Sequence, residues 1–200
     1  EEDYSRIYDD YEAFERSSKA IALSNGMKFG LIFVSKNDTN IFGYVQYVFP
    51  NSDAAQKGIK RGDIFTHVNG TQLSIDNFRE LLLSNKPSYT IDLATYNNNQ
   101  PQPTGTRVTL SNTQQTVRRI YTSKIIPHDG KKVGYIMYNG FTISQEDDLK
   151  NVFTDFATQQ IDELVLDLRY NPGGFLSTAQ LLAGLIAGEH AGKVFGKIVY

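Results

Sequence analysis

The segment Glu163–Gly174 (ELVLDLRYNPGG) constrains the fold of this chain more than any other stretch. Its first half is a short apolar run, typical of a strand that is covered on both faces. The run consists of Leu164, Val165, Leu166 and Leu168. Asn171-Pro172 then predicts a turn, and the two glycines after it allow backbone angles and close contacts that a Cβ would block. Apolar residues resume at Phe175 and predict a largely buried helix.

A strand, a glycine turn and a helix start leave backbone N–H groups pointing at one spot, where an anion could bind. From the residues alone, Gly173 and Gly174 fit an oxyanion hole, a phosphate cradle or only a tight turn.

Composition narrows the function classes. The 200 residues suit one large or two small domains, and 20 basic against 22 acidic side chains give a formal net charge of -2. No basic tract stands out, which argues against nucleic acid as the main partner. Cysteine is absent, which excludes disulfides, thiolate metal sites and a cysteine nucleophile. An exported bacterial protein often avoids thiols, although a cytosolic protein can also lack them.

The ends of the sequence predict a piece of a longer protein. The chain begins with Glu1-Glu2-Asp3, without Met or a signal segment, and ends in the apolar Ile198-Val199-Tyr200. No apolar run approaches the roughly 20 residues that span a bilayer.

The first part of the chain predicts one helix and then several short strands. Aromatic residues at helical spacing favour an amphipathic helix over residues 3–23. Strands are expected at 31–34, 43–49, 64–68 and 89–96, and a capped single-turn helix at 50–58. A second helix is expected over 76–83 with Ser74 as N-cap, and residues 97–105 (NNNQPQPTG) predict a loop inside a hairpin.

The second part of the chain follows α/β order. Strands are expected at 117–126 and 133–138, and a helix at 144–159, begun by a capping box of Ser144 and Asp147. The Leu164 strand and the Phe175 helix complete the run.

Two segments resemble known families. Residues 43–70 (GYVQYVFPNSDAAQKGIKRGDIFTHVNG) resemble the core of a bacterial PDZ domain, with Arg61-Gly62-Asp63 at its characteristic turn. Residues 133–188 resemble the first half of the carboxyl-terminal processing, or tail-specific, serine peptidase domain, and 167–174 (DLRYNPGG) is the most specific marker.

The resemblance implies a mixed α+β and α/β fold. We expect an N-terminal helical segment over 1–26, a PDZ-like, β-barrel-type domain over 27–114, and over 115–200 the first, truncated part of a crotonase/ClpP-like α/β peptidase domain.

A PDZ domain binds an extended C-terminal peptide at a sheet edge. By resemblance, the carboxylate loop is Met27-Lys28-Phe29-Gly30, and the edge strand runs from Leu31 through Ile32 and Phe33 to Val34. The opposite wall carries Phe78, Leu81 and Leu82. Lys28 either attracts the carboxylate or is a solvated lysine. The apolar side chains around the groove favour an apolar C-terminal residue in the ligand.

The resembled peptidases use a serine nucleophile and a lysine base held neutral by burial. The resemblance implies that Gly173 or Gly174 donates to the oxyanion, whereas Arg169 anchors the turn. The nucleophile and base are expected downstream and are absent from the chain, because Ser177 sits on the helix and Lys193 and Lys197 come too early. No metal site and no cofactor are expected.

The sequence therefore predicts a fragment of an exported, periplasmic or envelope serine endopeptidase, lipid-anchored or not, that binds protein C-termini and is itself inactive. One alternative is a non-catalytic PDZ scaffolding protein, and another is a crotonase-like acyl-transfer enzyme. A truncated sheet also predicts self-association of the fragment through its exposed edges.

Overall fold

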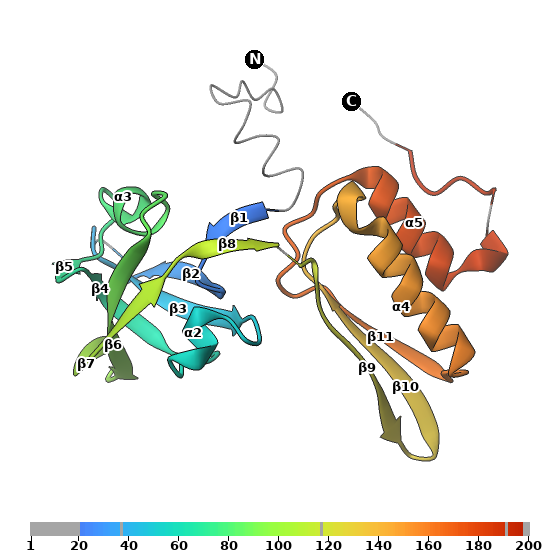
Figure 1. Cartoon of the computed structure of the whole chain (residues 1–200), viewed down its shortest axis with the longest axis horizontal. Helices are drawn as coiled ribbons and strands as arrows, with labels where there is room; N and C mark the ends of the chain where they lie inside the picture. The colour runs from blue at the N-terminus through green and yellow to red at the C-terminus, as the bar shows by residue number, and fades with distance from the viewer. Residues whose placement is uncertain (1–20, 37, 117, 191, 198–200) are drawn as a thin grey trace. The chain divides into compact units, whose positions relative to one another are not determined.

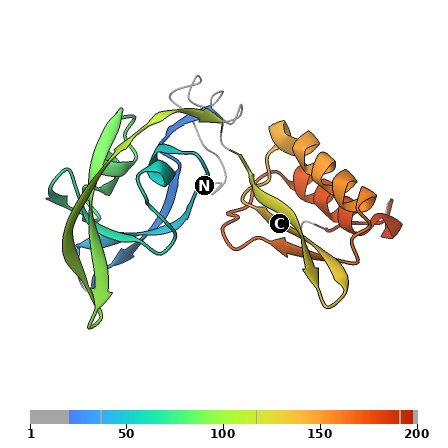
Figure 2. The same ribbon diagram turned by 60° about the horizontal axis from the view of Figure 1, so that its bottom comes forward.

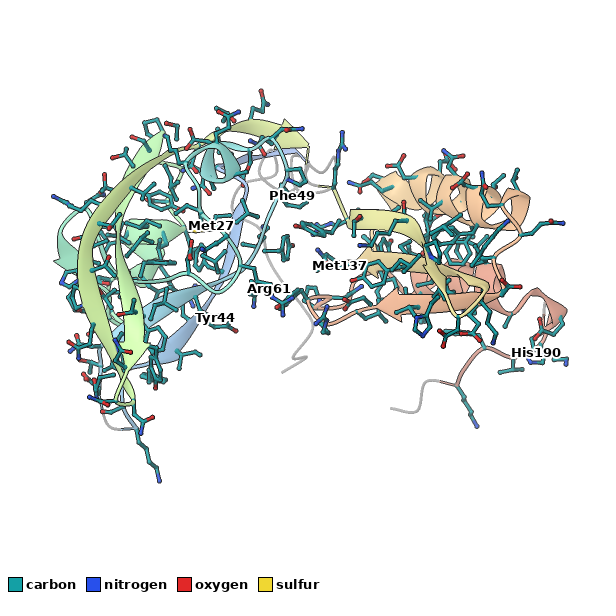
Figure 3. The ribbon with its side chains drawn as sticks, turned by 90° about the horizontal axis from the view of Figure 1, so that it is seen from below. Met27, Tyr44, Phe49, Arg61, Met137 and His190 are labelled. Atoms are coloured by element: carbon teal, nitrogen blue, oxygen red, sulfur yellow. The ribbon has the colours of Figure 1, made fainter. Side chains whose placement is uncertain are left out.

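The computed structural model describes residues 21–36, 38–116, 118–190 and 192–197 (Figure 1). The chain divides into two compact units, one spanning Ala22–Gln115 and the other containing the described residues from Thr116 onward. Met27 and Met137, both labelled in Figure 3, are buried in different units, with 4% and 5% of their surface exposed. Both units combine strands with helices, so the predicted mixed α+β fold is confirmed.

The first unit is built on an antiparallel sheet. Its strands lie in the order β2 (Met27–Phe33), β3 (Ile41–Val48), β4 (Ile64–Val68), β6 (Ser88–Asn97) and β7 (Gln100–Ser111), and β5 (Thr71–Gln72) pairs with β4. The two outer strands, β2 and β7, each have one partner among the described strands. The sheet is therefore open, and the expectation of a barrel-type domain is wrong.

Two short helices connect the strands. α2 (Asp53–Gln56) begins after Ser52, whose hydroxyl accepts a hydrogen bond from the Ala55 N–H at 3.3 Å, as the capped single turn predicted. α3 (Phe78–Leu82) is shorter than expected. The hydroxyl of Ser74 accepts from the N–H of Asp76 instead of capping the helix, because the chain makes a further turn before α3 begins.

The core of this unit contains Phe65, Val68 and Ile91, all fully buried. A register shift between Phe65 and His67 interrupts the alternation of β4, so Phe65 and Val68 both belong to the core although they are three positions apart. Gly43 lies directly against Phe65, where a Cβ would come 2.1 Å from the ring. The ring thus occupies the space that a side chain on β3 would otherwise fill.

The expected loop over 97–105 is largely strand. Only Asn98 and Asn99 form the turn, with φ of 50° and 58°, and β7 then runs through Pro101 and Pro103. Proline lacks an N–H and is confined to edge strands in a sheet. β7 is such an edge, so its prolines disrupt no second ladder.

The expected N-terminal helix lies outside the described residues up to residue 20. Ile21–Ser24 forms β1, which pairs with β8 (Thr113–Thr116), so the last residues of the expected 1–26 helical segment are extended.

The second unit is a three-stranded sheet with two helices. The order is β11 (Glu163–Asp167), β10 (Lys131–Tyr138) and β9 (Ile120–His128), with β11 parallel and β9 antiparallel to β10. α4 (Glu146–Thr158) and α5 (Leu176–Ile186) lie on the same face of this sheet (Figure 2). Short 3-10 turns, Ile143–Gln145 and Gly188–His190, precede α4 and follow α5. No helix in the described part of the chain has both the length and the apolar character needed to span a bilayer.

Two expectations for this unit are wrong. β11 is not covered on both faces: Leu164 and Leu166 pack into the core, whereas Val165 is 46% exposed, because both helices lie on one side. The capping box is also absent. Ser144 lies in the 3-10 turn and the helix begins at Glu146 with no side-chain cap, so Asp147 belongs to the first turn of α4.

Candidate functional sites: an edge groove and a glycine turn

The first candidate site follows the free edge of the first unit. Among the described strands β2 pairs with β3 alone, so it is an edge strand of this sheet, and such an edge can pair with a further strand. Phe29 and Leu31 pack against the core together with Phe78 and Leu81 of α3. A peptide added to β2 would therefore run beside the apolar face of α3.

The expected carboxylate loop is itself part of the strand. Met27, Lys28, Phe29 and Gly30 belong to β2 and pair with β3, because Met27 and Phe29 turn their side chains towards the core. The turn that precedes β2 is Asn25-Gly26, with Gly26 at φ +88°. The residues predicted as a loop are therefore strand, and the turn lies just before them.

A pocket of about 330 Å³ opens where β2 begins. Of the predicted binding residues, it brings together Met27, Lys28, Phe29 and Leu82. The others lie elsewhere on the two elements: Gly30, Leu31, Ile32, Phe33, Phe78 and Leu81. Gly30 lies against the ring of Tyr44, and Ile32 and Phe33 are 48% and 52% exposed. The predicted set thus divides into residues that line the pocket and residues further along β2 and α3.

The floor of this pocket is polar, which the sequence did not predict. The side-chain amide of Asn25 donates to the Tyr89 hydroxyl at 2.8 Å and to Asn112 Oδ1 at 3.0 Å, and its oxygen accepts from the Met27 N–H at 3.0 Å. Asn112 donates in turn to the carbonyl of Lys86 at 2.8 Å. Asn25 and Asn112 are 87 positions apart, so only the paired strands bring them together. The dipeptide Asn25-Gly26, which predicts a turn just before an apolar strand, was the one local sequence feature that pointed to this part of the pocket.

The second candidate site is the glycine turn after β11. Asn171 holds it in place: its Nδ2 donates to the carbonyl of Tyr138 at 3.0 Å, and its Oδ1 accepts from the Gly173 N–H at 2.8 Å. The first of the two predicted oxyanion donors, Gly173, is therefore already engaged in the turn.

Gly174 differs from its neighbour. Phe141 N–H donates to the Gly173 carbonyl and Phe175 N–H to the Phe141 carbonyl, both at 3.0 Å, so these bonds bracket Gly174. In such a parallel bridge the central residue directs its own N–H to the other side. No hydrogen bond of the Gly174 N–H is found within the described residues. A Cβ at this position would lie 2.1 Å from the Phe141 oxygen, and φ is +138°, so the turn requires glycine here.

A charged cluster closes the end of β11 beside this turn. Arg169 contacts both carboxylate oxygens of Asp167, with its Nη2 2.6 Å from Oδ2, and Tyr135 donates its hydroxyl to Oδ2 at 2.7 Å. The Arg169 guanidinium keeps the pKa of Asp167 well below its ordinary value, despite the burial of the carboxylate. Desolvation, with the neighbouring carboxylate, raises the pKa of Tyr135. Arg169 thus folds back onto the strand end.

The N-terminus of the helix after the turn favours negative charge. α5 begins at Leu176, and the N–H groups of its first turn have no partner within the helix, so a nearby anion is stabilised. Ser177 is exposed on this first turn, and no lysine hydrogen-bonds to it in the described residues. The Nζ of Lys193 lies 3.1 Å from the imidazole of His190, well after α5 in the chain. A paired nucleophile and base are therefore not found among these residues.

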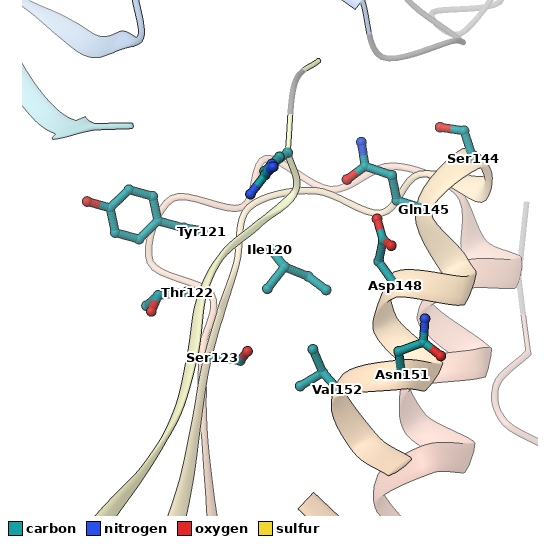
Figure 4. A pocket seen from close by; sticks show the side chains of 10 residues that line it. Ile120, Tyr121, Thr122, Ser123, Ser144, Gln145, Asp148, Asn151 and Val152 are labelled. Atoms are coloured by element: carbon teal, nitrogen blue, oxygen red, sulfur yellow. The ribbon is translucent and has the colours of Figure 1, made fainter. Parts of the chain in front are cut away.

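A larger pocket of about 720 Å³ lies between β9 and the start of α4 (Figure 4). Gln145, Asp148 and Asn151 line its helix side, and Ile120 lines the strand side. It is lined by neither glycine of the turn, and no predicted site residue belongs to it.

Known proteins resemble this chain at two levels, in the sequence of one segment and in the fold of most of its length. Residues 132–196 match the model of peptidase family S41. The carboxyl-terminal-processing protease of Picosynechococcus sp. is 29% identical over 140 residues, which cover 68% of this chain and 33% of that protein. A putative S41 protease from Bacteroides fragilis is 32% identical, with a TM-score of 0.59 over 89% of this chain and 53% of that one.

The photosystem II D1 C-terminal processing protease shares the fold at 19% identity, with a TM-score of 0.56 over 86% of this chain and 46% of that one. The chain thus spans about a third of the length of the curated relative and about half of each structural neighbour. The glycine turn lies inside the matched segment. Through that segment, the chain is similar to peptidase family S41 and to a carboxyl-terminal-processing protease.

Proposed function

We propose that this chain is part of an exported serine-type endopeptidase that binds protein C-termini and cleaves near them. The first unit acts as a PDZ domain, and the second supplies one wall of the hydrolytic site. The nucleophile and its lysine base come from polypeptide outside these 200 residues.

The observation that carries the peptidase half is the position of Gly174. Its N–H is uncommitted among the described residues, it lies at a turn that only glycine can adopt, and it precedes the N-terminus of α5. A backbone donor fixed in this way needs no rearrangement to stabilise the negative oxygen of a tetrahedral intermediate. Gly173 positions the turn and is not a donor, because Asn171 takes its N–H.

The binding half is supported by β2, which has one strand partner among the described residues. Main-chain bonds to β2 would supply affinity, and the apolar side chains of Phe29, Leu31 and Phe78 would contact alternate side chains of the ligand. We propose a preference for apolar residues along this groove.

Two experiments test the proposal. Peptides with free and amidated C-termini are titrated against the chain, and the free acids should bind more tightly; equal affinity would refute recognition of the C-terminus. In the protein encoded by the complete gene, Gly174→Ala should lower kcat with little change in KM, because the Cβ clash with Phe141 displaces an N–H that acts on the transition state. Unchanged kcat in a folded variant would remove Gly174 from the catalytic site.

The chain alone should not hydrolyse these peptides. Hydrolysis by the purified 200 residues that Ser177→Ala abolishes would contradict the proposed origin of the nucleophile.

A second candidate is a non-catalytic peptide-binding protein. One observation favours it: the pocket and groove of the first unit are complete within the chain, whereas the glycine turn has no nucleophile and base beside it in the described residues. A complete gene that lacks either the serine or the lysine would select this function.

A further inference from the structure

Tyr89 places a hydrogen-bond donor at the floor of the pocket where β2 begins. The residue is 5% exposed and lies on β6, and its hydroxyl oxygen accepts from the Asn25 amide. A tyrosine hydroxyl also carries one proton of its own to donate. That proton has no acceptor within the part of the chain that the structure describes.

The neighbouring amides are bonded to one another and to the backbone. Both N–H groups of the Asn25 amide are used, one on Tyr89 and one on Asn112 Oδ1, and the Asn25 oxygen accepts from Met27. No hydrogen bond from the Tyr89 hydroxyl to either amide oxygen is found among the described residues. Burial also raises the pKa of Tyr89, so the phenol stays protonated at neutral pH and remains a donor.

One further hydroxyl of the lining adds to this donor character. Ser24 Oγ already accepts from the Gly26 N–H at 3.0 Å, which leaves its proton to give. Asn25 Oδ1 and Asn112 Oδ1 each accept one hydrogen bond within the pocket floor. The Tyr89 and Ser24 hydroxyls therefore complement a ligand group that accepts hydrogen bonds.

The position of the pocket identifies which part of a ligand reaches it. A peptide that pairs antiparallel with β2 has its C-terminal end beside the N-terminal end of β2. The pocket lies there, lined by Met27, Lys28 and Phe29. Its volume of about 330 Å³ is roughly ten times the 30 Å³ that one water occupies in the liquid, which is room for one residue.

We propose that Tyr89 is a specificity-determining residue, whose hydroxyl donates to an acceptor oxygen of the last residue of the bound peptide. This inference rests on the proposed peptide binding. The acceptor is either the terminal carboxylate or a side-chain oxygen, and the two are separated by experiment. The apolar preference then applies to the residues further along the groove.

Four peptides of one sequence test the proposal, ending in Asn or in Leu, each as the free acid and as the amide. Asn and Leu side chains are similar in size, but only Asn carries an acceptor. Each peptide is titrated against the wild-type chain, Tyr89→Phe, and the matched control Tyr44→Phe, whose hydroxyl accepts from an amide at 3.4 Å and does not line the pocket.

Tyr89→Phe should weaken binding between about two- and tenfold, the range of one neutral hydrogen bond, and Tyr44→Phe should not. Loss of the acid-over-amide preference identifies the carboxylate as acceptor, and loss of the Asn-over-Leu preference identifies the side chain. If Tyr89→Phe binds all four peptides as the wild type does, with the acid preference intact, the inference is wrong and the proposed function stands. If no peptide binds the wild-type chain, both are wrong.

Tyr89→Phe also leaves one Asn25 N–H without its acceptor, so its fold is checked by circular dichroism. Should it not fold, the ¹³Cζ resonance of Tyr89 in the labelled wild-type chain is followed instead. It should shift more with the free acids or with the Asn peptides than with the Leu amide, whose carboxamide oxygen is the weakest of these terminal acceptors. Equal shifts for all four would overturn the inference.

Discussion

Replacing Gly174 by alanine should destabilise the second unit far more than the same change at Gly173. At Gly174 the new Cβ would lie 2.1 Å from the Phe141 oxygen, so the two backbone hydrogen bonds around Phe141 must break or lengthen. Each contributes about 0.5–1.5 kcal/mol, and a positive φ adds strain of about 1–3 kcal/mol. The expected loss in the free energy of unfolding is about 2–6 kcal/mol.

At Gly173 a Cβ meets no atom within 4 Å, and only the strain of φ +109° remains, about 1–3 kcal/mol. Gly184→Ala is the matched control in the following helix. It has open space and ordinary helical φ, so it should stabilise the unit by about 0.5–1 kcal/mol.

Native-state hydrogen exchange, read by mass spectrometry, gives the opening free energy of each unit separately. Segments of β10 and α5 report the change, and β6 in the first unit is the internal reference. If Gly174→Ala and Gly173→Ala agree within about 0.5 kcal/mol, the close approach to Phe141 is not the reason for glycine at 174.

Three further predictions concern other parts of the chain. Because the pKa of Asp167 is lower in the folded than in the unfolded chain, where it is about 4, the ionised carboxylate stabilises the fold above about pH 4. This stabilisation should be lost as the pH falls below about 4 towards the folded pKa, so the free energy of urea unfolding between pH 7 and pH 2 should decline less in Asp167→Asn than in the wild type. An identical decline in the two proteins would contradict this prediction. β11 is an edge strand among the described strands and Val165 is exposed on it, so the wild-type chain should self-associate at high concentration in sedimentation velocity. Val165→Lys should self-associate less, and a strictly monomeric wild type would refute the prediction. Ser52→Ala removes the cap on Ala55 and should cost the first unit about 1 kcal/mol in urea unfolding, with no change expected if the cap carries no energy.

Local sequence patterns predicted most strands and helices correctly because their causes are local. Asn69-Gly70 adopts the positive φ pair, 52° and 79°, that its dipeptide indicates, and Ser52 caps α2. The apolar run at Leu164 did form a strand. Its exposure was mispredicted because a residue pattern does not report whether a second layer is present.

The errors came from effects that act at a distance. Pro101 and Pro103 predicted a loop, but an edge strand tolerates proline, and whether a strand is an edge depends on the whole sheet. In the pocket, apolar Met27, Phe29 and Leu82 were found from the sequence. The polar floor was not, because Tyr89 lies 64 positions from its partner Asn25.

The Asn25 amide bridges the turn before β2, strand β6 and the residue after β7. The pocket floor consequently exists only when the two ends of this unit have come together, and no single hairpin can form it. Binding of a peptide in the pocket is therefore coupled to cooperative folding of Ala22–Gln115. A saturating peptide should raise the melting temperature of that whole unit instead of ordering one loop.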